Sequence, residues 1–592
     1  MIHKLIDFSI NNKFVIALLT LALVIGGIYS VQQVPVDAVP DITNNQIQII
    51  TQSPSLGTED IEQFVTYPIE IAVANLPDVT EIRSISRFGL SIVTIVFSDE
   101  LNTYLPRQLV SEKLGQINSS IPEGFGKPFM GPISTGLGEI YQYTLEVAPD
   151  FKDIYSSQEL RTIQDWIIRR QMAMVPGVVE VNAIGGNIKQ YEVAIDPDEL
   201  NSLGLTISDV YNALENNNQN TGGAYIEKNH QANFIRGEGL ARSLEDIKNI
   251  VVTNRNDLPI TINDIGNVKF GSAIRYGALT KNGKGEAVGG TIMMLKGANT
   301  NKVIDAVKVR IEQIQKSLPK GVTIKPFLDR SKLIASTTST VRNNLIEGAL
   351  IVIFILVFFL GNWRGGLIVA STIPLSLLFA FILMHIFDVW ANLMSLGAID
   401  FGIIVDGAVI IVESTVFMIY KQVSKKKEIT EIEKNDITLK ASSKMMNTAF
   451  FGQFIILIVF LPILSLEGVE GKMFIPMALT FIFAMIGAMV LCLTYVPMVT
   501  SYFITVPKSN KKYWGDKIVF ALENIYEKSL VRSMKKGKLI IISSLVLLAT
   551  SVYIFFNLGG EFIPKLDEGD IAFHVILKPG SALSETIEVT TK

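Results

Sequence analysis

Cysteine is almost absent from this chain, and charged residues are scarce. The 592 residues include one cysteine, Cys492, and four histidines, while Asp, Glu, Lys and Arg together make up 18%. A single cysteine excludes a disulfide framework and a zinc site built from cysteines. The net charge is only −4 and basic, aromatic-interleaved patches are missing, so nucleic-acid binding is not expected. Nucleotide-binding loops, HExxH motifs and hydrolase triads are also missing, so we expect neither an enzyme nor a cofactor.

Hydrophobic residues are abundant, at 48%, and they gather in long runs. A membrane-spanning helix needs roughly 20 mainly apolar residues, and seven segments meet or approach this length. The first segment lacks a small-residue cleavage site, so we interpret it as a span rather than a removable signal. The sequence therefore predicts an α-helical transmembrane bundle with spans at residues 13–32, 343–360, 366–387, 392–420, 450–466, 474–505 and 538–556.

Basic flanks orient these spans, because Lys and Arg are enriched on the cytoplasmic side of membrane helices. Lys4 and Lys13 precede the first span, "YKQVSKKKE" follows the fourth, and two basic stretches separate the sixth from the seventh. The N-terminus is therefore predicted to be cytoplasmic. The predicted domains are the N-terminus with the first span (1–32), a first periplasmic porter and docking domain (33–342), spans two to six (343–506), a cytoplasmic amphipathic connector (507–537), the seventh span (538–556) and the start of a second periplasmic repeat (557–592).

The long segment after the first span has the pattern of a folded α+β domain. Strand "QIQIITQS", a helix over 57–76, a hairpin turning near Gly89 and a helix over 105–121 follow one another. The order recurs with "YQYTLEV", a helix over 157–174, a hairpin over 178–195 and a helix over 208–216. A later strand–helix–strand unit runs from "AVGGTIMML" to "VTIKPFL". This order is typical of split βαβ, ferredoxin-like subdomains.

A longer repeat links the two ends of the chain. "VPVDAVPDITNNQIQIITQSPSLGTEDIE" after the first span aligns with "LGGEFIPKLDEGDIAFHVILKPGSALSETIE" after the seventh. In both segments a stretch with proline and acidic residues comes first, and a predicted strand, a turn and the start of a helix follow in the same order. We interpret the chain as the N-terminal part of a duplicated protein of nearly twice its size, and chance similarity is the alternative.

Three carboxylates interrupt the fourth apolar run, "GAIDFGIIVDGAVIIVE": Asp400, Asp406 and Glu413. A charge at the bilayer centre costs at least about 2.5–3.5 kcal/mol on the insertion scale. Asp406 and Glu413 are seven residues apart, so a helix places them within about 20° of one face, whereas Asp400 lies about 120° from Asp406. Burial raises the pKa of a carboxyl group, and a chain of such groups can pass protons. Lys and Arg occur in the seven runs only as the first residues Lys13 and Lys538, so we favour a proton relay over ion pairs that only hold helices together.

The segment "DFGIIVDGAVIIVE" resembles the signature of the heavy-metal efflux branch of the RND (resistance–nodulation–division) superfamily, as do "EFIPKLDEGD", "VPVDAVPDIT" and "GPISTGLGEIYQYTLE". The resemblance covers essentially the whole chain. It implies the RND transporter fold, C-terminally truncated, in a homotrimeric pump of the bacterial inner membrane driven by proton antiport. It also implies a periplasmic adaptor protein and an outer-membrane channel as partners, and it gives the proton-relay role to Asp400, Asp406 and Glu413.

The same resemblance gives two candidate metal ligands, His574 and Glu139. His574 lies in "LDEGDIAFHVILKPG", where copper and silver relatives have a Met, and imidazole suits zinc, cobalt or nickel better than Cu(I). Asp400 is typical of cobalt-, zinc- and cadmium-type members. Glu139, in "GLGEIYQY", is an acid that can supply an oxygen ligand. The prediction is therefore proton-driven efflux of divalent cations, and an ordinary strand histidine is the alternative for His574.

Other functions stay open at the level of the sequence. An RND pump for copper or silver would share most of these motifs. A pump for drugs or amphiphiles would carry two adjacent acids in its fourth span and an aromatic-rich external pocket. A non-transporting RND-like sensor or secretion accessory would keep the fold without needing His574. A truncated, inactive product is the last alternative.

Overall fold

The structure is a computed structural model that describes residues 2–54, 56–255, 257–360, 363–397, 399–423, 430–504, 514–559, 571, 573, 575–578 and 580–591. It divides into two compact units. The first comprises residues 1–138, 296–302 and 330–572, and the second comprises residues 139–295, 303–329 and 573–592.

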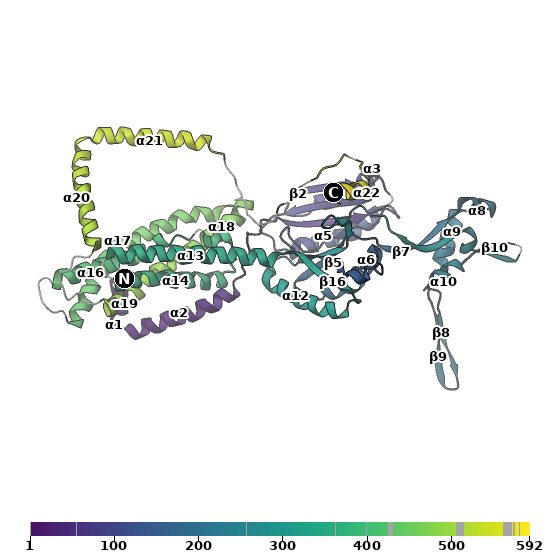
Figure 1. Cartoon of the computed structure of the whole chain (residues 1–592), viewed down its shortest axis with the longest axis horizontal. Helices are drawn as coiled ribbons and strands as arrows, with labels where there is room; N and C mark the ends of the chain where they lie inside the picture. Colours follow the sequence, from purple (N-terminus) through teal and green to yellow (C-terminus); the bar gives the residue numbers. More distant parts are fainter. Residues whose placement is uncertain are drawn as a thin grey trace. The chain divides into compact units, whose positions relative to one another are not determined.

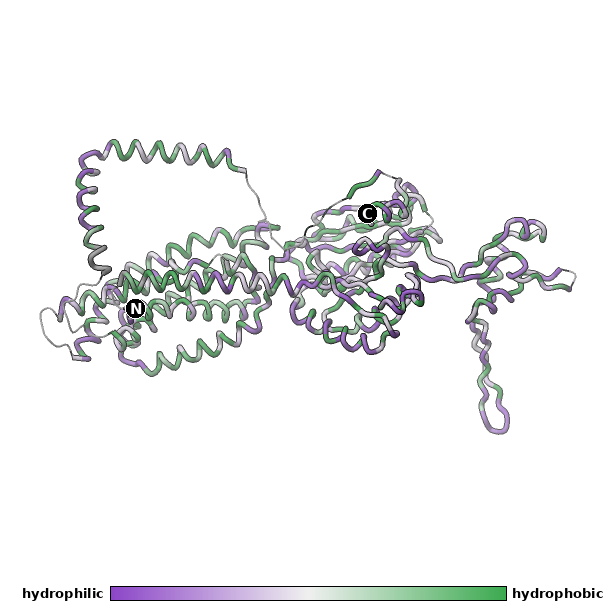
Figure 2. Tube along the Cα trace, in the orientation of Figure 1, coloured by the Kyte–Doolittle hydropathy of each residue, from purple (hydrophilic) through white to green (hydrophobic). Residues whose placement is uncertain are grey.

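The first unit contains a bundle of apolar helices (Figure 1). Among the described residues, six helical stretches are long and apolar enough to cross a membrane: Lys13–Gln33, Trp363–Ile386, Leu393–Gln422, Glu431–Ser465, Gly468–Leu493 and Gly537–Asn557. Figure 2 shows the predominance of hydrophobic residues along these helices. The bundle helices are α1 (Ile2–Asn11), α2 (Lys13–Gln33), α13 (Arg330–Leu360), α14 (Trp363–Ile386), α15 (Leu393–Gly397), α16 (Phe401–Val423), α17 (Glu431–Phe460), α18 (Gly468–Leu493) and α19 (Tyr495–Phe503), followed by α20 (Trp514–Lys535) and α21 (Gly537–Asn557).

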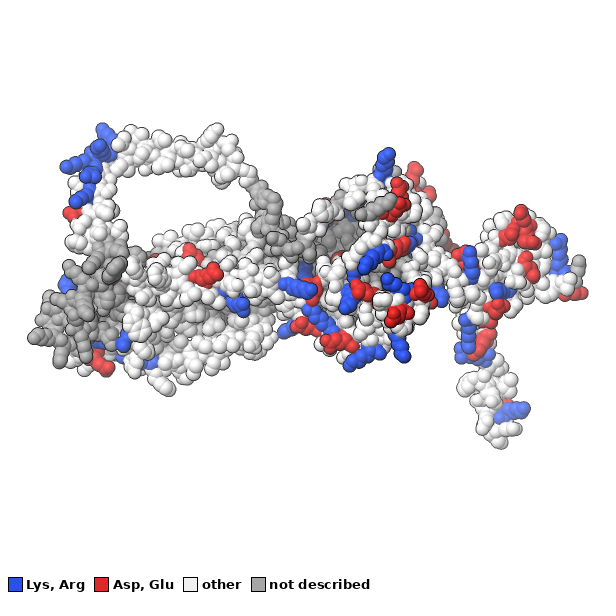
Figure 3. Space-filling view, viewed as in Figure 1, with Lys and Arg blue, Asp and Glu red and all other residues white. Residues whose placement is uncertain are grey.

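Helix α14 packs against α2, α13, α16 and α18, and the buried core of the bundle gathers around it. Gly27 of α2 gives room for this packing, because a side chain there would collide with Leu378 of α14. Few charged side chains occur on the visible face of the bundle, as Figure 3 shows. These features position α16, which carries Asp406 and Glu413, beside the centre of the bundle.

Helix boundaries differ from the apolar runs in the sequence. Residues 343–360 are the second half of α13, and residues 450–466 begin within α17. Helix α17 starts earlier because Thr430 and Glu433 form a capping box, in which the Glu433 amide donates to the Thr430 hydroxyl at 3.3 Å. The run at 474–505 is two helices that break at Thr494, and the run at 392–420 is likewise divided into α15 and α16. Hydropathy marks the apolar part of a helix, whereas caps decide where the helix starts.

An α+β subdomain of the first unit follows α2. Its four-stranded sheet has the order β2-β3-β1-β4, which is the ferredoxin-like arrangement predicted from the sequence. Alternate residues of β1 and β3, such as the paired Ile49 and Val93, are buried under the helices. The elements are β1 (Asn45–Gln52), the continuous helix α3 (Thr58–Ile61), η1 (Glu62–Thr66) and α4 (Tyr67–Ala74), β2 (Val79–Arg87), β3 (Leu90–Phe97), α5 (Tyr104–Ser120) and β4 (Phe129–Met130).

The second unit repeats this arrangement with a sheet of order β16-β5-β15-β6. Here the sequence-based prediction of a hairpin over 178–195 is wrong. Strand β6 pairs with β15, while β7 pairs with β12 in a separate ribbon. Gly185 and Gly186, both with positive φ, turn the chain out of the sheet after β6. The elements are β5 (Glu139–Val147), α6 (Ser157–Ile163), η3 (Gln164–Ile168), α7 (Arg169–Met172), β6 (Val178–Ile184), β7 (Lys189–Ile195), β15 (Gly289–Met294), α12 (Thr300–Ser317) and β16 (Val322–Asp329).

Residues between β7 and β15 form an insertion with its own small core, which includes Val210, Ile262 and Ile265. A long hairpin of β8 and β9 extends from it with exposed side chains throughout most of its length (Figure 1). The insertion contains α8 (Pro197–Ser202), α9 (Ile207–Asn216), β8 (Thr221–Lys228), β9 (Gln231–Gly237), α10 (Leu244–Lys248), β10 (Val251–Arg255), β11 (Leu258–Thr261), α11 (Ile262–Ile265), β12 (Gly266–Ser272), β13 (Leu279–Thr280) and β14 (Glu286–Ala287). Helix α22 (Leu583–Thr591) lies near the end of the chain.

Candidate functional site

Helix α16 has one buried face and one open face. Its buried side chains pack into the bundle: Ile404, Val405, Ala408, Ile411, Val412, Val416 and Ile419. The exposed positions recur at helical spacing on the other side: Gly402, Asp406, Glu413 and Phe417. An apolar membrane-length helix therefore presents two carboxylates along a single stripe.

Asp406 and Glu413 share this open face, as their spacing predicts. In the described part of the chain, neither carboxylate forms a salt bridge, so the two acids do not serve to pair helices there. The acids were expected to be buried, but both side chains are exposed. The described helices cover only the opposite face of α16, which leaves the acid stripe accessible to solvent or to another helix.

Asp400 lies outside helix α16, which begins at Phe401. Its Oδ1 accepts a hydrogen bond from the backbone N–H of Gly402 at 2.8 Å, and its side chain is exposed. The expected angle of about 120° between Asp400 and Asp406 assumed one continuous helix, so that expectation is wrong. Asp400 instead satisfies an N–H group at the start of the acid-bearing helix, in the manner of a helix cap.

Gly407 is a place where α16 approaches two neighbouring helices closely. A side chain at this position would collide with the amide of Gln453 in α17 and the thiol of Cys492 in α18. Gln453 is 3% exposed, and within the described ranges neither polar atom of its amide has a hydrogen-bond partner. Side chains added at Gly397 and Gly402, by contrast, would meet no neighbouring helix.

Glu139, the predicted oxygen ligand, is the first residue of strand β5 and is exposed. The Gln142 amide donates a hydrogen bond to its Oε2 at 2.8 Å. The register places Met293 of β15 opposite Glu139 on one side and opposite Glu180 of β6 on the other. The ladder shifts register beside Met293 on both sides, so this methionine lies at an irregularity of the sheet with Glu139 and Glu180 as its register partners. Sequence reasoning missed Glu180 and Met293, because the pairing joins strands that lie far apart in the chain.

His574 lies outside the described residues. Among the residues that the structure does describe, no three His, Cys, Asp or Glu side chains come together as a metal site. His385 lies edge-on to Tyr29 with ring centroids 6.1 Å apart.

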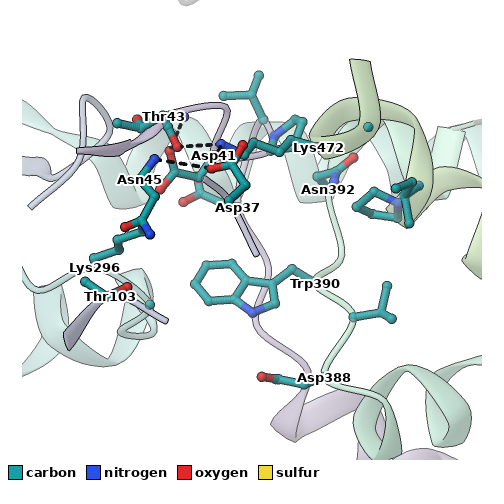
Figure 4. Close-up of a pocket in the computed structure, with 18 of the residues that line it drawn as sticks. Asp37, Asp41, Thr43, Asn45, Thr103, Lys296, Asp388, Trp390, Asn392 and Lys472 are labelled. Atoms are coloured by element: carbon teal, nitrogen blue, oxygen red, sulfur yellow. Dashed lines mark hydrogen bonds and ion pairs between the residues drawn. The ribbon is translucent and has the colours of Figure 1, made fainter. Parts of the chain in front are cut away.

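A cavity of about 760 Å³ lies within the first unit, where α2, α14 and α18 begin or end. Its wall combines aspartates and lysines with the indole of Trp390 (Figure 4). None of the residues predicted to carry protons or metal lines it. The cavity is therefore separate from both candidate sites.

Comparison with known proteins gives consistent matches along the chain. A sequence profile of the AcrB/AcrD/AcrF family matches residues 5–592. HelA of Legionella pneumophila is 44% identical over 590 residues, which cover 99% of this chain and 56% of HelA. The cobalt-zinc-cadmium resistance protein CzcA of Cupriavidus metallidurans is 43% identical over 594 residues, which cover all of this chain and 55% of CzcA.

The fold matches as well. A crystal structure of a heavy metal efflux pump superposes with a TM-score of 0.85 at 33% sequence identity, covering 99% of this chain and 56% of that one. The chain thus spans about half the length of the relatives that it matches.

Proposed function

This chain belongs to the AcrB/AcrD/AcrF family of RND proteins, and we propose that it works in proton-driven efflux of divalent heavy-metal cations. The proposed cargo is of the zinc, cobalt and cadmium type. The proposed pump is a secondary transporter of the bacterial inner membrane rather than an enzyme. As in the sequence-based prediction, it would act as a homotrimer with a periplasmic adaptor protein and an outer-membrane channel.

The observation that carries the proton part of this proposal is the acid stripe of α16. Asp406 and Glu413 lie on one open face of a helix whose other face is buried and apolar. An ionised carboxylate is costly within a membrane, so such groups gain stability by binding a proton when they leave water. If these two carboxyl groups alternate between water and an apolar environment, they would release protons in water and take up protons in the apolar environment. Asp400, at the start of the helix, would be the third member.

The cargo part of the proposal rests on donor chemistry and similarity. Carboxylates suit borderline divalent ions better than Cu(I), which prefers sulfur. Glu139 and Glu180 offer two such oxygen ligands in one row of the sheet, and Met293 between them offers a softer donor. His574 would add an imidazole. The name of the related CzcA refers to cobalt, zinc and cadmium resistance, which supports the same choice of cargo for this chain.

A transport experiment tests the proposal. The protein, in the full length that its gene encodes, would be expressed in cells that lack their own metal exporters. We expect protection against zinc, cobalt or cadmium, and we expect it to collapse when an uncoupler removes the proton gradient. Protection confined to copper or silver would contradict the cargo. Protection that survives the uncoupler would contradict proton coupling.

A further inference from the structure

The cavity of the first unit has a two-sided lining. One side comes from the ends of membrane-length helices and their loops, with Trp390 after α14 and Ile475, Pro476 and Leu479 in the first turns of α18. The other side comes from the polar chain segments that follow α2 and precede α5, and includes Thr43, Asn45 and Asn102. The helix side also contributes Asp388 and Lys472, and the other side also contributes Leu101, so apolar and charged groups are mixed in the lining. Such a lining suits an amphiphile.

The position of the cavity agrees with this chemistry. Helix α14 ends at Ile386, α2 ends at Gln33 and α18 begins at Gly468, so the cavity lies at the level where apolar helices stop. Tryptophan is enriched at that level of membrane proteins, because its ring is apolar and its N–H is polar. In the view of Figure 4, the Trp390 indole lies between the group formed by Asp41, Thr43 and Lys472 and the side chain of Asp388.

Three of the six charged residues in the wall have an ion-pair partner. Lys472 Nζ donates hydrogen bonds to Asp99 Oδ1 at 2.7 Å and to the Thr43 carbonyl at 3.0 Å. Asp37 accepts a hydrogen bond from Arg330, which lies outside the cavity wall, at 3.1 Å. These pairs neutralise two of the four aspartates that line the cavity. The other two aspartates, Asp41 and Asp388, form no salt bridge in the described part of the chain.

Lys296 is the one lysine of this cavity wall that has no salt bridge in the described part of the chain. It is half-buried, and burial lowers the pKa of its ammonium group. The favourable field of Asp41 and Asp99 only partly offsets burial, and Lys472 lowers the pKa further. The cavity thus holds a poorly solvated cation, whose charge Asp41 and Asp99 only partly compensate, and the carboxylate of Asp388, which forms no salt bridge in the described part of the chain.

We propose that this cavity binds a zwitterionic phospholipid of the membrane leaflet at this level. Its phosphate would lie against Lys296, and its amine would lie near the carboxylate of Asp388 or Asp41. The upper parts of its acyl chains would pack against Trp390, Ile475 and Leu479. Neither Glu139, Asp406 nor Glu413 takes part, so the proposal stands independently of metal efflux.

Two physical arguments select this occupant. The volume of about 760 Å³ is within the range of roughly 300–1,000 Å³ that encloses drug-sized ligands, enough for a head group and the start of its chains. The wall also carries unpaired charge of both signs, so a purely anionic head would meet repulsion from Asp41 and Asp388. A head with one phosphate and one amine satisfies both signs at once.

Tryptophan quenching provides the test. In a variant with Trp166, Trp363 and Trp514 replaced by Phe, Trp390 is the remaining tryptophan of residues 1–592, and any tryptophan that the full protein has outside these residues would be replaced in the same way. The full protein in maltoside micelles would be titrated with phosphatidylethanolamine brominated near the head-group end of its chains. We expect saturable quenching at one lipid per protein chain. A brominated fatty acid and a brominated alkyl maltoside, which lack the phosphate and the amine, should quench only at much higher concentrations.

The variant Lys296→Gln should weaken lipid binding roughly ten- to a hundredfold, since it removes a charge-assisted hydrogen bond, and Lys296→Arg should restore most of it. The matched control is Lys332→Gln, because Lys332 is an exposed lysine of the same unit at the start of α13. Without any substitution at Lys296, binding should weaken as the pH rises through the lowered pKa of this lysine. Equal quenching by all three brominated compounds, or quenching insensitive to both Lys296→Gln and pH, would overturn the proposal.

Discussion

The carboxylate of Asp37 lies 3.1 Å from the guanidinium of Arg330, although 293 residues separate them in the sequence. Both side chains are about 10% exposed. Asp37 Oδ2 also accepts a hydrogen bond from the Thr300 hydroxyl at 3.1 Å, and Arg330 donates to the Leu137 carbonyl at 2.6 Å. One carboxylate thereby joins the segment after α2 to the first residues of α12 and α13.

The backbone around Asp37 extends this junction toward the acid-bearing helix. The Asp37 N–H donates to the Ala391 carbonyl at 3.0 Å, and the Ala391 N–H donates to the Pro35 carbonyl at 2.9 Å. Ala391 lies two residues before α15, which precedes α16. The start of the acid-bearing region is therefore anchored to the same segment as Arg330.

The first prediction concerns this buried pair. Arg330→Met should lower the free energy of unfolding by about 3–5 kcal/mol, because it leaves the Asp37 carboxylate buried without its cation. The matched control is Lys332→Met, which removes an exposed cation from the same turn of α13. Thermal unfolding of the purified protein in detergent provides the measurement. Adding Asp37→Asn to Arg330→Met should cost less than the two single changes summed, and strict additivity would show that the two side chains do not interact.

The second prediction concerns the acid stripe. Asp406→Asn should abolish proton-coupled metal export while leaving expression and assembly intact, because an amide cannot carry the proton. Glu413→Gln should have the same effect if both acids belong to one relay. Asp436→Asn is the control, since Asp436 is an exposed acid of α17 that pairs with Lys440. The measurement is metal-triggered proton movement in proteoliposomes. Wild-type flux in Asp406→Asn would refute the relay assignment.

The third prediction concerns the carboxylate row of the second unit. Glu180→Gln should reduce resistance to zinc, cobalt or cadmium as strongly as Glu139→Gln, since the two residues flank the same methionine. Glu146→Gln serves as the control, because Glu146 belongs to the same strand as Glu139 but forms a salt bridge with Lys281 at 2.7 Å. Resistance assays and metal titration of the purified protein both apply. A loss in Glu139→Gln alone would remove Glu180 from the proposed site.

The fourth prediction concerns His574 and pH. His574→Met should lower resistance to zinc, cobalt or cadmium, because a thioether is a poorer ligand for these ions than imidazole. Metal affinity of the unsubstituted protein should fall as the pH drops below about 6.5, the ordinary pKa of histidine, since a protonated imidazole cannot coordinate. Calorimetric titration at several pH values tests this. A pH profile identical in His574→Met and the unsubstituted protein would mean that His574 is an ordinary strand residue.

Local patterns predicted much of the fold. Alternating apolar residues indicated β1 and the pair β2 and β3, and the structure confirms them together with the ferredoxin-like strand order. Local patterns did not predict the pairing of strands that lie far apart in the sequence. The glycines at 185 and 186 looked like a hairpin turn, yet the neighbour of β6 in the sheet is β15, about 100 residues further along. Glycine residues indicate where the chain turns. The strand with which the following or preceding segment pairs depends on how the whole domain packs.

The sequence alone determined the apolar helices, the shared helix face of Asp406 and Glu413 and the family, because each depends on residue types at short spacings. Only the tertiary structure decided that Asp400 precedes the acid-bearing helix, that Glu180 lies in one row with Glu139, and that Lys296 and Trp390 line one cavity. Those relationships join segments separated by tens to hundreds of residues. Their geometry follows from packing the whole chain, which no local periodicity encodes.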